Sequence, residues 1–508
     1  MYTRGKNAML NIVAGFAAQI LIILIAFIGR KVFVHFLSLD YLGINGLYSN
    51  ILSVLALAEL GLGNVTQFFL YKPVAEKKEA EITYLVKYFK HLYRIIACTI
   101  LALGLAFIPF LRYVVNSDLS NPELIAYYVI FLLNSVVSYL SAHSVALLAA
   151  NQDNRLQKYV LLGTNFAAQG LQIGCLFIWR NYYIYVTITL LLTLVNVVVI
   201  NRICSIRYPY LKNKTNVVPD GFDRQFILDN VKSTFVYKIG ATIVNNTDNI
   251  LISIIVSTAA VGLYSNYFLV VSSVQTFIAI ITTALISGVG NLSADGNKKR
   301  MYEVFNVMLL IYQFIAVFGA IGFYFLFDDL MTIWLGSEYM LGKFTVFAIV
   351  LNFYSSNAIS PIWMYRESNG LFKKVKYLFL VTAGVNVVLS VLFGELWGMA
   401  GILLATSIAR VLTQVWYEPR ILFKEVFGIS SKYYWRKQAK LIILSSICFI
   451  ICWRFNGYLP HSAIFMVIKA ILFLIVCMIV FTVGMIGTTE MHELKYRVNE
   501  LLDRFRRS

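Results

Sequence analysis

Charged side chains are scarce in this sequence of 508 residues, and acidic ones are the scarcest, with 25 Asp and Glu against 43 Lys and Arg. Charged residues make up 13% of the chain and apolar residues 59%, whereas an ordinary soluble domain is about 25% charged and about 45–50% apolar. A globular interior is too small to hide so many apolar side chains from water. The composition therefore excludes a soluble enzyme or a nucleic-acid-binding protein, and it indicates an integral membrane protein.

Cysteines and ligand-binding motifs are also sparse. The six cysteines lie inside apolar runs, and although Cys448 and Cys452 share a helix face, no pair falls in a loop outside the membrane. We therefore expect no disulfide and no metal site. No Gly-rich phosphate-binding loop is present, so nothing indicates ATP hydrolysis. The apolar run at residues 8–36 is too long for a cleaved signal peptide and is expected to stay as the first helix.

About fourteen apolar runs are long enough to cross a bilayer. Backbone groups in lipid must be satisfied internally, and these runs lack the polar and apolar alternation of membrane β-strands, so each is expected to be a helix. The sequence thus predicts an all-α integral membrane fold. The expected spans are residues 8–36, 42–71, 84–114, 123–150, 158–179, 183–205, 226–257, 262–294, 301–327, 342–365, 375–393, 398–422, 439–455 and 462–487.

Lys and Arg residues gather in alternate loops. One set of loops carries nearly all of them, whereas the opposite set holds Arg112, Arg180, Lys343 and Arg454. Cytoplasmic loops carry the excess of Lys and Arg, so both termini are predicted to be cytoplasmic, and the net charge of +18 mainly reflects this orientation. The tail at residues 488–508 is expected to form an amphipathic helix, with apolar side chains on one face and Lys and Arg on the other. Such a helix is expected to lie on the anionic inner leaflet.

The loops predicted to lie outside are short, the longest being about residues 328–341. Asp328 and Asp329 form the acidic pair in that loop, and we read them as a solvated helix end in preference to a metal site. So little material outside the membrane argues against an enzyme that polymerises or transfers lipid-linked sugars.

A short repeat gives the domain organisation. The segment GLYSN at residues 46–50 recurs 216 positions later at residues 262–266, in both cases just after an outside turn. Six helices separate the copies, and an even number implies two parallel repeats, an arrangement common in transporters. The predicted parts are an N-lobe (1–205), a cytoplasmic linker (206–225), a C-lobe (226–425), two further helices (426–487) and the tail (488–508).

Charged side chains inside the predicted spans are candidate substrate-binding residues, because a charge at mid-bilayer costs about 2.5–3.5 kcal/mol on insertion scales. Arg30 lies ten residues below the turn at Asp40, or roughly 15 Å along a helix. A polar cluster formed by Asn245, Asp248 and Asn249 lies at similar depth in the seventh helix. An alternative role for Arg30 is to snorkel to the outer interface. The alternative for Asp248 is a structural role, as a helix cap or as part of a buried pair.

Three further charges lie within predicted helices. Glu59 precedes two glycines, so a cavity role and a helix-packing role are both open. Arg410 is near the middle of the twelfth helix, and we favour a cavity-facing cation there. Lys469 is well inside the last helix, where it could face a cavity or anchor the outer interface.

Several segments carry a family resemblance. LDYLGINGLYSN at residues 39–50, LAELGLG at 57–63 and LYKPVA at 70–75, together with NTDNILIS at 246–253, VGLYSNY at 261–267 and GNL at 290–292, resemble polysaccharide repeat-unit flippases of the Wzx type. These belong to the multidrug/oligosaccharidyl-lipid/polysaccharide (MOP) exporter superfamily. The resemblance implies a bacterial cytoplasmic-membrane protein that moves an undecaprenyl-pyrophosphate-linked oligosaccharide to the outer leaflet, for capsule, exopolysaccharide or O-antigen assembly. It also matches Arg30 to a cavity-lining arginine of related flippases, but it offers no match for Arg410 or Lys469.

The implied activity needs no cofactor and is not enzymatic. Its energy source is open between the membrane potential and a Na⁺ or H⁺ gradient, and a polysaccharide polymerase is a possible partner besides the membrane lipids. Two alternatives stay open: a small-molecule antiporter like the multidrug (MATE) transporters on the same fold, and a membrane-embedded polymerase or glycosyltransferase. The electrostatic potential in the cavity distinguishes the antiporter from a flippase, because a cavity lined by several cations would disfavour cationic drugs.

Overall fold

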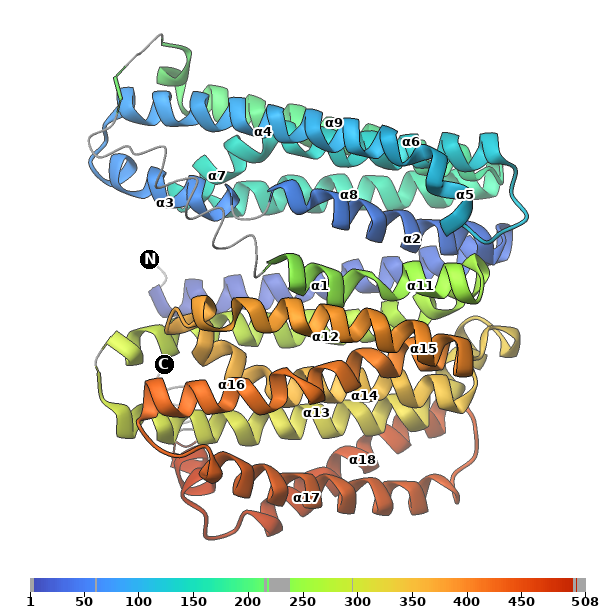
Figure 1. The fold of residues 1–508 in the computed structure, drawn as a ribbon, viewed down its shortest axis with the longest axis vertical. Coiled ribbons are helices and arrows are strands. Elements are labelled where there is room, and N and C mark those ends of the chain that lie inside the picture. The colour runs from blue at the N-terminus through green and yellow to red at the C-terminus, as the bar shows by residue number, and fades with distance from the viewer. Residues whose placement is uncertain are drawn as a thin grey trace. The chain divides into compact units, whose positions relative to one another are not determined.

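The computed structural model describes residues 4–59, 62–213, 217–218, 238–294, 296–496 and 499. Helices are the regular structure of this part of the chain, and no strand occurs in it (Figure 1). The predicted all-α fold is confirmed. The chain divides into two units, Met1–Asn266 and Tyr267–Ser508, and each is described by itself.

Unit 1 is a bundle of long helices around an aromatic and aliphatic core. Two buried tyrosines connect its helices through backbone carbonyls: Tyr48 donates to Leu124 O at 3.0 Å and Tyr128 donates to Gly104 O at 3.1 Å. Their rings also meet edge to face. The helices are α1 (Arg4–Phe36), α2 (Leu39–Leu55), α3 (Leu62–Ala75), α4 (Glu79–Phe107), α5 (Leu111–Val114), α6 (Asn121–Ser138), α7 (Ala142–Ala150), α8 (Asn154–Ile178), α9 (Tyr182–Arg207), α11 (Asp248–Ile255) and the first turns of α12 (Thr258–Ala294).

Unit 2 continues α12 and has an aromatic core of its own. The rings of Phe305, Tyr365 and Phe427 pack on one another, and the Tyr365 hydroxyl donates to Met301 O at 2.9 Å. The remaining helices are α13 (Lys298–Trp334), α14 (Lys343–Ser368), α15 (Phe372–Leu412), α16 (Gln414–Leu422), α17 (Lys432–Asn456) and α18 (Ala463–Gly484).

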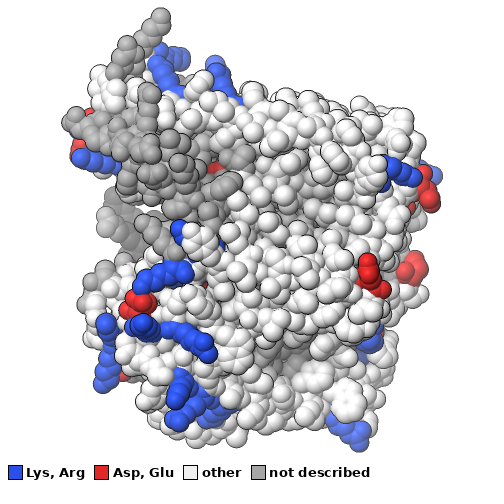
Figure 2. Space-filling view, in the orientation of Figure 1, with Lys and Arg blue, Asp and Glu red and all other residues white. Residues whose placement is uncertain are grey.

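The helices are suited to a bilayer. Among the described residues, 11 helical stretches are long and apolar enough to cross one. On the face in Figure 2, Lys and Arg side chains lie mostly near the ends of the helices, and a broad uncharged band lies between. This is the distribution of a multi-pass membrane protein, because charges in the hydrocarbon region are costly.

The expected count of 14 spans is not confirmed, and three places account for the difference. The second predicted span, 42–71, is divided by a 3₁₀ turn at Ala56–Glu59. Most of the first half of the seventh, 226–257, lies outside the described residues. The eleventh and twelfth are two helices that count as the single element α15 and meet at a kink, where Gly398 adopts φ 58° and breaks the helical geometry. Glycine tolerates this positive φ because it has no Cβ.

The predicted lobe boundaries at 1–205 and 226–425 stay predictions. Half of the expected linker at 206–225 falls outside the described residues, as does about half of the tail at 488–508. In the described part, the regular helix α18 ends at Gly484.

Glycines allow the beginnings of α2 and α12 to touch within unit 1. A Cβ added at Gly43 would lie 1.9 Å from the backbone oxygen of Thr258, and one at Gly262 would lie 2.3 Å from the backbone oxygen of Leu39. Only residues without a side chain permit such an approach. Gly262 begins the second GLYSN segment, so the repeated motif has a direct packing role.

Candidate functional site

Arg30 lies on α1, with its guanidinium against the second copy of the repeat. Its Nη1 donates to Ser265 Oγ at 2.7 Å and to Asn266 Oδ1 at 3.3 Å. The side chain is partly buried, and among the described residues it forms no ion pair. Arg30 is therefore a fixed cation whose charge is not neutralised by a carboxylate of the described chain.

The polar cluster predicted at the seventh helix lies where that helix breaks. Residues 238–246 are helical, Thr247 forms a bend, and α11 begins at Asp248. A carboxylate in the first turn of a helix is favoured by the helix dipole. Asn245 is exposed. Asn249 packs beside Gly46 of α2, and its Oδ1 is buried without a hydrogen-bond partner among the described residues.

Two hydrogen bonds to backbone carbonyls hold the chain together at the predicted outer end of this region. Ser253 Oγ donates to Val114 O at 2.8 Å, and Thr258 N donates to Asn116 O at 2.9 Å. These bonds join the end of α5 and the residues after it to α11 and to the start of α12. Asp40 lies at the start of α2, ten residues after Arg30. Burial raises the pKa of Asp40, and the negative charge of Asp118 raises it further.

Lys469 is completely buried in α18 and is paired. Its Nζ lies 2.9 Å from Asp329 Oδ2, and His461 Nδ1 hydrogen-bonds the other oxygen of that carboxylate. Asp329 is 4% exposed, so our interpretation of Asp328 and Asp329 as a solvated helix end is wrong for Asp329. The described residues hold no group of three or more potential metal ligands. Lys469 and Asp329 neutralise each other, which favours a structural role for this lysine.

Arg410 lies in α15, beside α14. Its Nη1 donates to Ser356 Oγ at 2.7 Å. One turn before it, Ser407 donates to Asn352 Oδ1 at 2.8 Å, and Asn352 in turn donates to Leu403 O at 2.6 Å. The arginine thus belongs to a polar network that joins two helices of unit 2.

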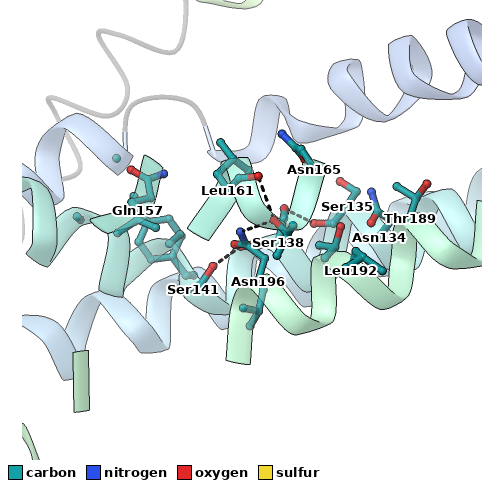
Figure 3. Close-up of a pocket in the computed structure, with 18 of the residues that line it drawn as sticks. Asn134, Ser135, Ser138, Ser141, Gln157, Leu161, Asn165, Thr189, Leu192 and Asn196 are labelled. Carbon is teal, nitrogen blue, oxygen red and sulfur yellow. Dashed lines mark hydrogen bonds between the residues drawn. The ribbon is translucent and has the colours of Figure 1, made fainter. Parts of the chain in front are cut away.

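Glu59 lines a cavity of about 460 Å³ inside unit 1. The walls come from α3, α4, α6, α7, α8 and α9 and from the two 3₁₀ turns at Ala56–Glu59 and Tyr139–Ser141. Figure 3 shows its amides and hydroxyls converging, with Asn134, Ser138 and Asn196 on neighbouring helices. The turn at Ala56–Glu59 ends the first half of the predicted second span, and this break places the carboxylate at the cavity.

A second cavity, of about 530 Å³, lies in unit 2 and is apolar. Its walls are aliphatic and aromatic side chains of α12, α13, α14 and α18, among them Phe277, Phe314, Phe353 and Met466. Such a lining suits hydrocarbon and offers nothing to a polar headgroup.

Sequence reasoning also missed the buried ion pair between Arg366 and Glu418. Arg366 Nη1 lies 2.7 Å from Glu418 Oε2, and both side chains are buried. Arg366 also lies over the ring of Phe379. Both residues sit near the ends of predicted spans, where basic and acidic residues are common, so the sequence offered no signal of burial.

The family of the chain follows from a sequence comparison. A family described as polysaccharide biosynthesis protein matches residues 46–342, which include both GLYSN segments. The chain belongs to this family. No curated protein matches the sequence.

Comparison with solved structures shows the fold of this chain. The structure named lipid II flippase MurJ in an inward closed conformation has a TM-score of 0.60 at 15% identity, covering 92% of this chain and 99% of that one. An inward-facing multidrug resistance MATE transporter of the MOP superfamily has a TM-score of 0.57 at 16% identity, covering 80% and 99%. The Vibrio cholerae MATE transporter VcmN gives 0.54 at 13%, covering 81% and 96%.

These findings confirm the resemblance read from the sequence. The chain has the fold shared by a flippase and by MATE transporters, and it falls in a polysaccharide biosynthesis family. Its family and structural neighbours are membrane transport proteins and not enzymes, in agreement with the sequence prediction. At such low identity the structural likeness establishes the fold alone, and the substrate needs a separate argument.

Proposed function

We propose that this protein flips an undecaprenyl-pyrophosphate-linked oligosaccharide from the inner to the outer leaflet of the bacterial cytoplasmic membrane. The observation that carries the proposal is Arg30, a partly buried cation with no ion-pair partner among the described residues, bonded to Ser265 and Asn266 of the repeated motif. Such a charge within a membrane span is costly unless it serves a ligand or a cavity.

The chemistry of the substrate fits the two kinds of surface in the protein. A pyrophosphate that is esterified at both ends carries two negative charges, and a guanidinium binds phosphate oxygens through paired N–H donors. Among the described residues, the hydrogen bonds of Arg30 to Ser265 and Asn266 are made by Nη1, and we propose that Nη2 and Nε bind the anion. The apolar cavity of unit 2 offers a place for part of the polyprenyl chain.

Of the other candidates, we keep Arg410, which donates to Ser356, as a substrate-contacting cation, and Asn245, Asp248 and Asn249 as polar groups at a depth similar to that of Arg30. Their roles stay predictions. Lys469 is the weakest candidate, because Asp329 already neutralises it in a fully buried pair.

The transport cycle we propose is alternating access, in which two parallel repeats move against each other and expose the site to each leaflet in turn. For energy we propose the membrane potential, since moving an anion outward across an inside-negative membrane gains about 2.3 kcal/mol per charge per 100 mV. A Na⁺ or H⁺ gradient coupled through Asp248 or Glu59 is the rival. Transport into vesicles at a clamped potential separates the two.

The product of this step would supply a polysaccharide polymerase, for capsule, exopolysaccharide or O-antigen assembly. We place both termini in the cytoplasm, as the distribution of Lys and Arg between loops predicts.

Depletion of the protein in its host tests the proposal. Mass spectrometry of the extracted lipids should then show a polyprenyl-pyrophosphate-linked oligosaccharide that accumulates and stays inaccessible to enzymes added outside the cells. Accumulation of incomplete sugar chains instead would indicate a glycosyltransferase, and accumulation of externally accessible repeat units would indicate a polymerase. An unchanged lipid pool, combined with raised drug sensitivity, would favour a small-molecule antiporter.

A further inference from the structure

The cavity of unit 1 has a lining that is unusual for the interior of a membrane helix bundle. Polar side chains from five helices and two 3₁₀ turns line it, including Asn134, Ser138, Gln157, Asn165 and Thr189 (Figure 3). Its volume of about 460 Å³ lies within the range of small-molecule sites, about 300–1,000 Å³. Polar groups within a membrane-spanning bundle are costly unless they are satisfied, so the polar side chains of this mixed lining favour a polar occupant.

The groups in the cavity are arranged to accept and donate several hydrogen bonds at once. Ser138 and Ser141 donate to backbone carbonyls of their own segment, which leaves their oxygens as acceptors. Asn196 donates to Thr164 at 3.2 Å, so this part of the wall is already fixed. Asn134 Oδ1 is buried and has no hydrogen-bond partner among the described residues. A ligand hydroxyl that donates to Asn134 would satisfy this oxygen.

The charge of the lining restricts the ligand. Of the described residues that line the cavity, Glu59 is the charged one, and Lys, Arg and His do not contribute. A pyrophosphate or an acidic sugar would meet a carboxylate and no cation. A bare metal ion is a poor occupant of so large a cavity, and the described residues contain no cluster of three potential metal ligands.

We infer that this cavity is a subsite for an uncharged, hydroxyl-rich sugar, with Glu59 accepting hydrogen bonds from sugar hydroxyls and disfavouring hexuronic acids. Sugar hydroxyls both donate and accept, which matches a lining of amides and hydroxyls. The inference rests on the proposed function and deepens it, because it assigns the sugar portion of the substrate to unit 1. The Tyr139 hydroxyl lies within hydrogen-bonding reach of Glu59 and would hold the carboxylate in place.

The test compares two substrates in proteoliposomes containing the full chain. One is undecaprenyl pyrophosphate with a neutral disaccharide, and the other is the same lipid with one hexose oxidised to hexuronic acid. An enzyme added outside the vesicles hydrolyses the pyrophosphate to undecaprenyl phosphate and a disaccharide phosphate, and mass spectrometry counts the released disaccharide phosphate. We expect the wild type to move the neutral substrate about tenfold faster, and Glu59→Gln to bring the two rates close together, because the repulsion between two carboxylates is then gone.

Two alanines on α8 provide a matched pair for blocking the cavity. Ala168 lines it, whereas Ala167 beside it is exposed and does not. Ala168→Phe should lower transport of the neutral substrate at least about tenfold, since it removes the space for the sugar. Ala167→Phe makes the same chemical change outside the cavity and should transport as the wild type does. For Glu59→Gln, the two transport rates are measured in one preparation of vesicles. The ratio of the rates for the two substrates therefore does not depend on the yield of folded protein.

The outcomes separate the two proposals. Equal rates for both substrates in the wild type, with wild-type transport by Ala168→Phe, would overturn the sugar subsite while leaving the flippase proposal intact. Transport of neither substrate above the rate in empty vesicles would overturn the flippase proposal itself.

Discussion

Arg30 and Ser265, which are 235 positions apart, are joined by a hydrogen bond of 2.7 Å from Nη1 to Oγ. Ser265 belongs to the second GLYSN segment, and Asn266 beside it accepts a further bond from the same Nη1. The arginine of the first predicted repeat is therefore held by the motif of the second. This contact orients the guanidinium without neutralising it, as an anion-binding residue requires.

Replacing Arg30 tests its role as an anion-binding residue. Arg30→Ala should lower flipping at least about tenfold, because a hydrogen bond to a charged group contributes about 1.5–3 kcal/mol. Arg30→Lys should retain part of the activity, since it keeps the charge but loses the planar fork. The control is Lys31→Ala, which removes an exposed cation at the adjacent position. Equal flipping rates in Arg30→Ala and Lys31→Ala would contradict the assignment.

Lys469 should matter for stability more than for substrate binding. Lys469→Met leaves Asp329 buried without its cation, at a cost of about 3–5 kcal/mol. The control is Lys343→Met, because Lys343 lies 2.6 Å from Asp328 but is 56% exposed, and such pairs contribute about 0–1 kcal/mol. Thermal unfolding of the purified variants measures the difference. If Lys469→Met kept its stability but lost transport, Lys469 would be assigned to substrate binding.

Gly43 should keep α2 and α12 in contact at the predicted outer side of unit 1. Gly43→Ala places a methyl group 1.9 Å from Thr258 O, so α2 and α12 must separate. We expect Ser257→Cys, in the segment before α12, to react faster with a membrane-impermeant thiol reagent in the Gly43→Ala background. Gly174→Ala is the control, since no atom lies within 4 Å of its added Cβ. Equal labelling in both backgrounds would show that this contact does not control access.

Asp40 should make stability depend on pH. Burial and the charge of Asp118 raise the pKa of Asp40 above its unfolded value, so ionisation disfavours the folded state. This penalty is absent below the unfolded pKa, about 4, and is complete above the folded pKa. Asp40→Asn removes it and should therefore raise the melting temperature at pH 7, with a gain that shrinks as the pH falls toward 4. A gain independent of pH would contradict this account.

The helices were predictable because lipid leaves the backbone few choices. Apolar runs of spanning length must become helices, and α1, α8 and α9 begin and end close to the predicted residues. Local breaks were harder to predict. The break near Gly398, where the twelfth span was expected to begin, is present as a kink between two helices, whereas the 3₁₀ turn inside the second predicted span was not expected.

The candidate site was only partly visible in the sequence. Arg30 stood out because a lone cation in an apolar run is costly, whereas its partners Ser265 and Asn266 became known only from the fold. The pairing of Lys469 with Asp329 joins residues 140 positions apart, which no local pattern reveals. The polar cavity was missed because each helix contributes only a few uncharged side chains, and such residues are individually unremarkable in a sequence.

The measurement that tests the central claim most directly is flipping of an undecaprenyl-pyrophosphate-linked oligosaccharide by the purified protein in proteoliposomes. The fraction of substrate accessible from outside should rise with time in vesicles that contain the wild type, and it should stay at the level of empty vesicles when they contain Arg30→Ala in folded form. Equal accessibility with wild type, Arg30→Ala and no protein would contradict the account.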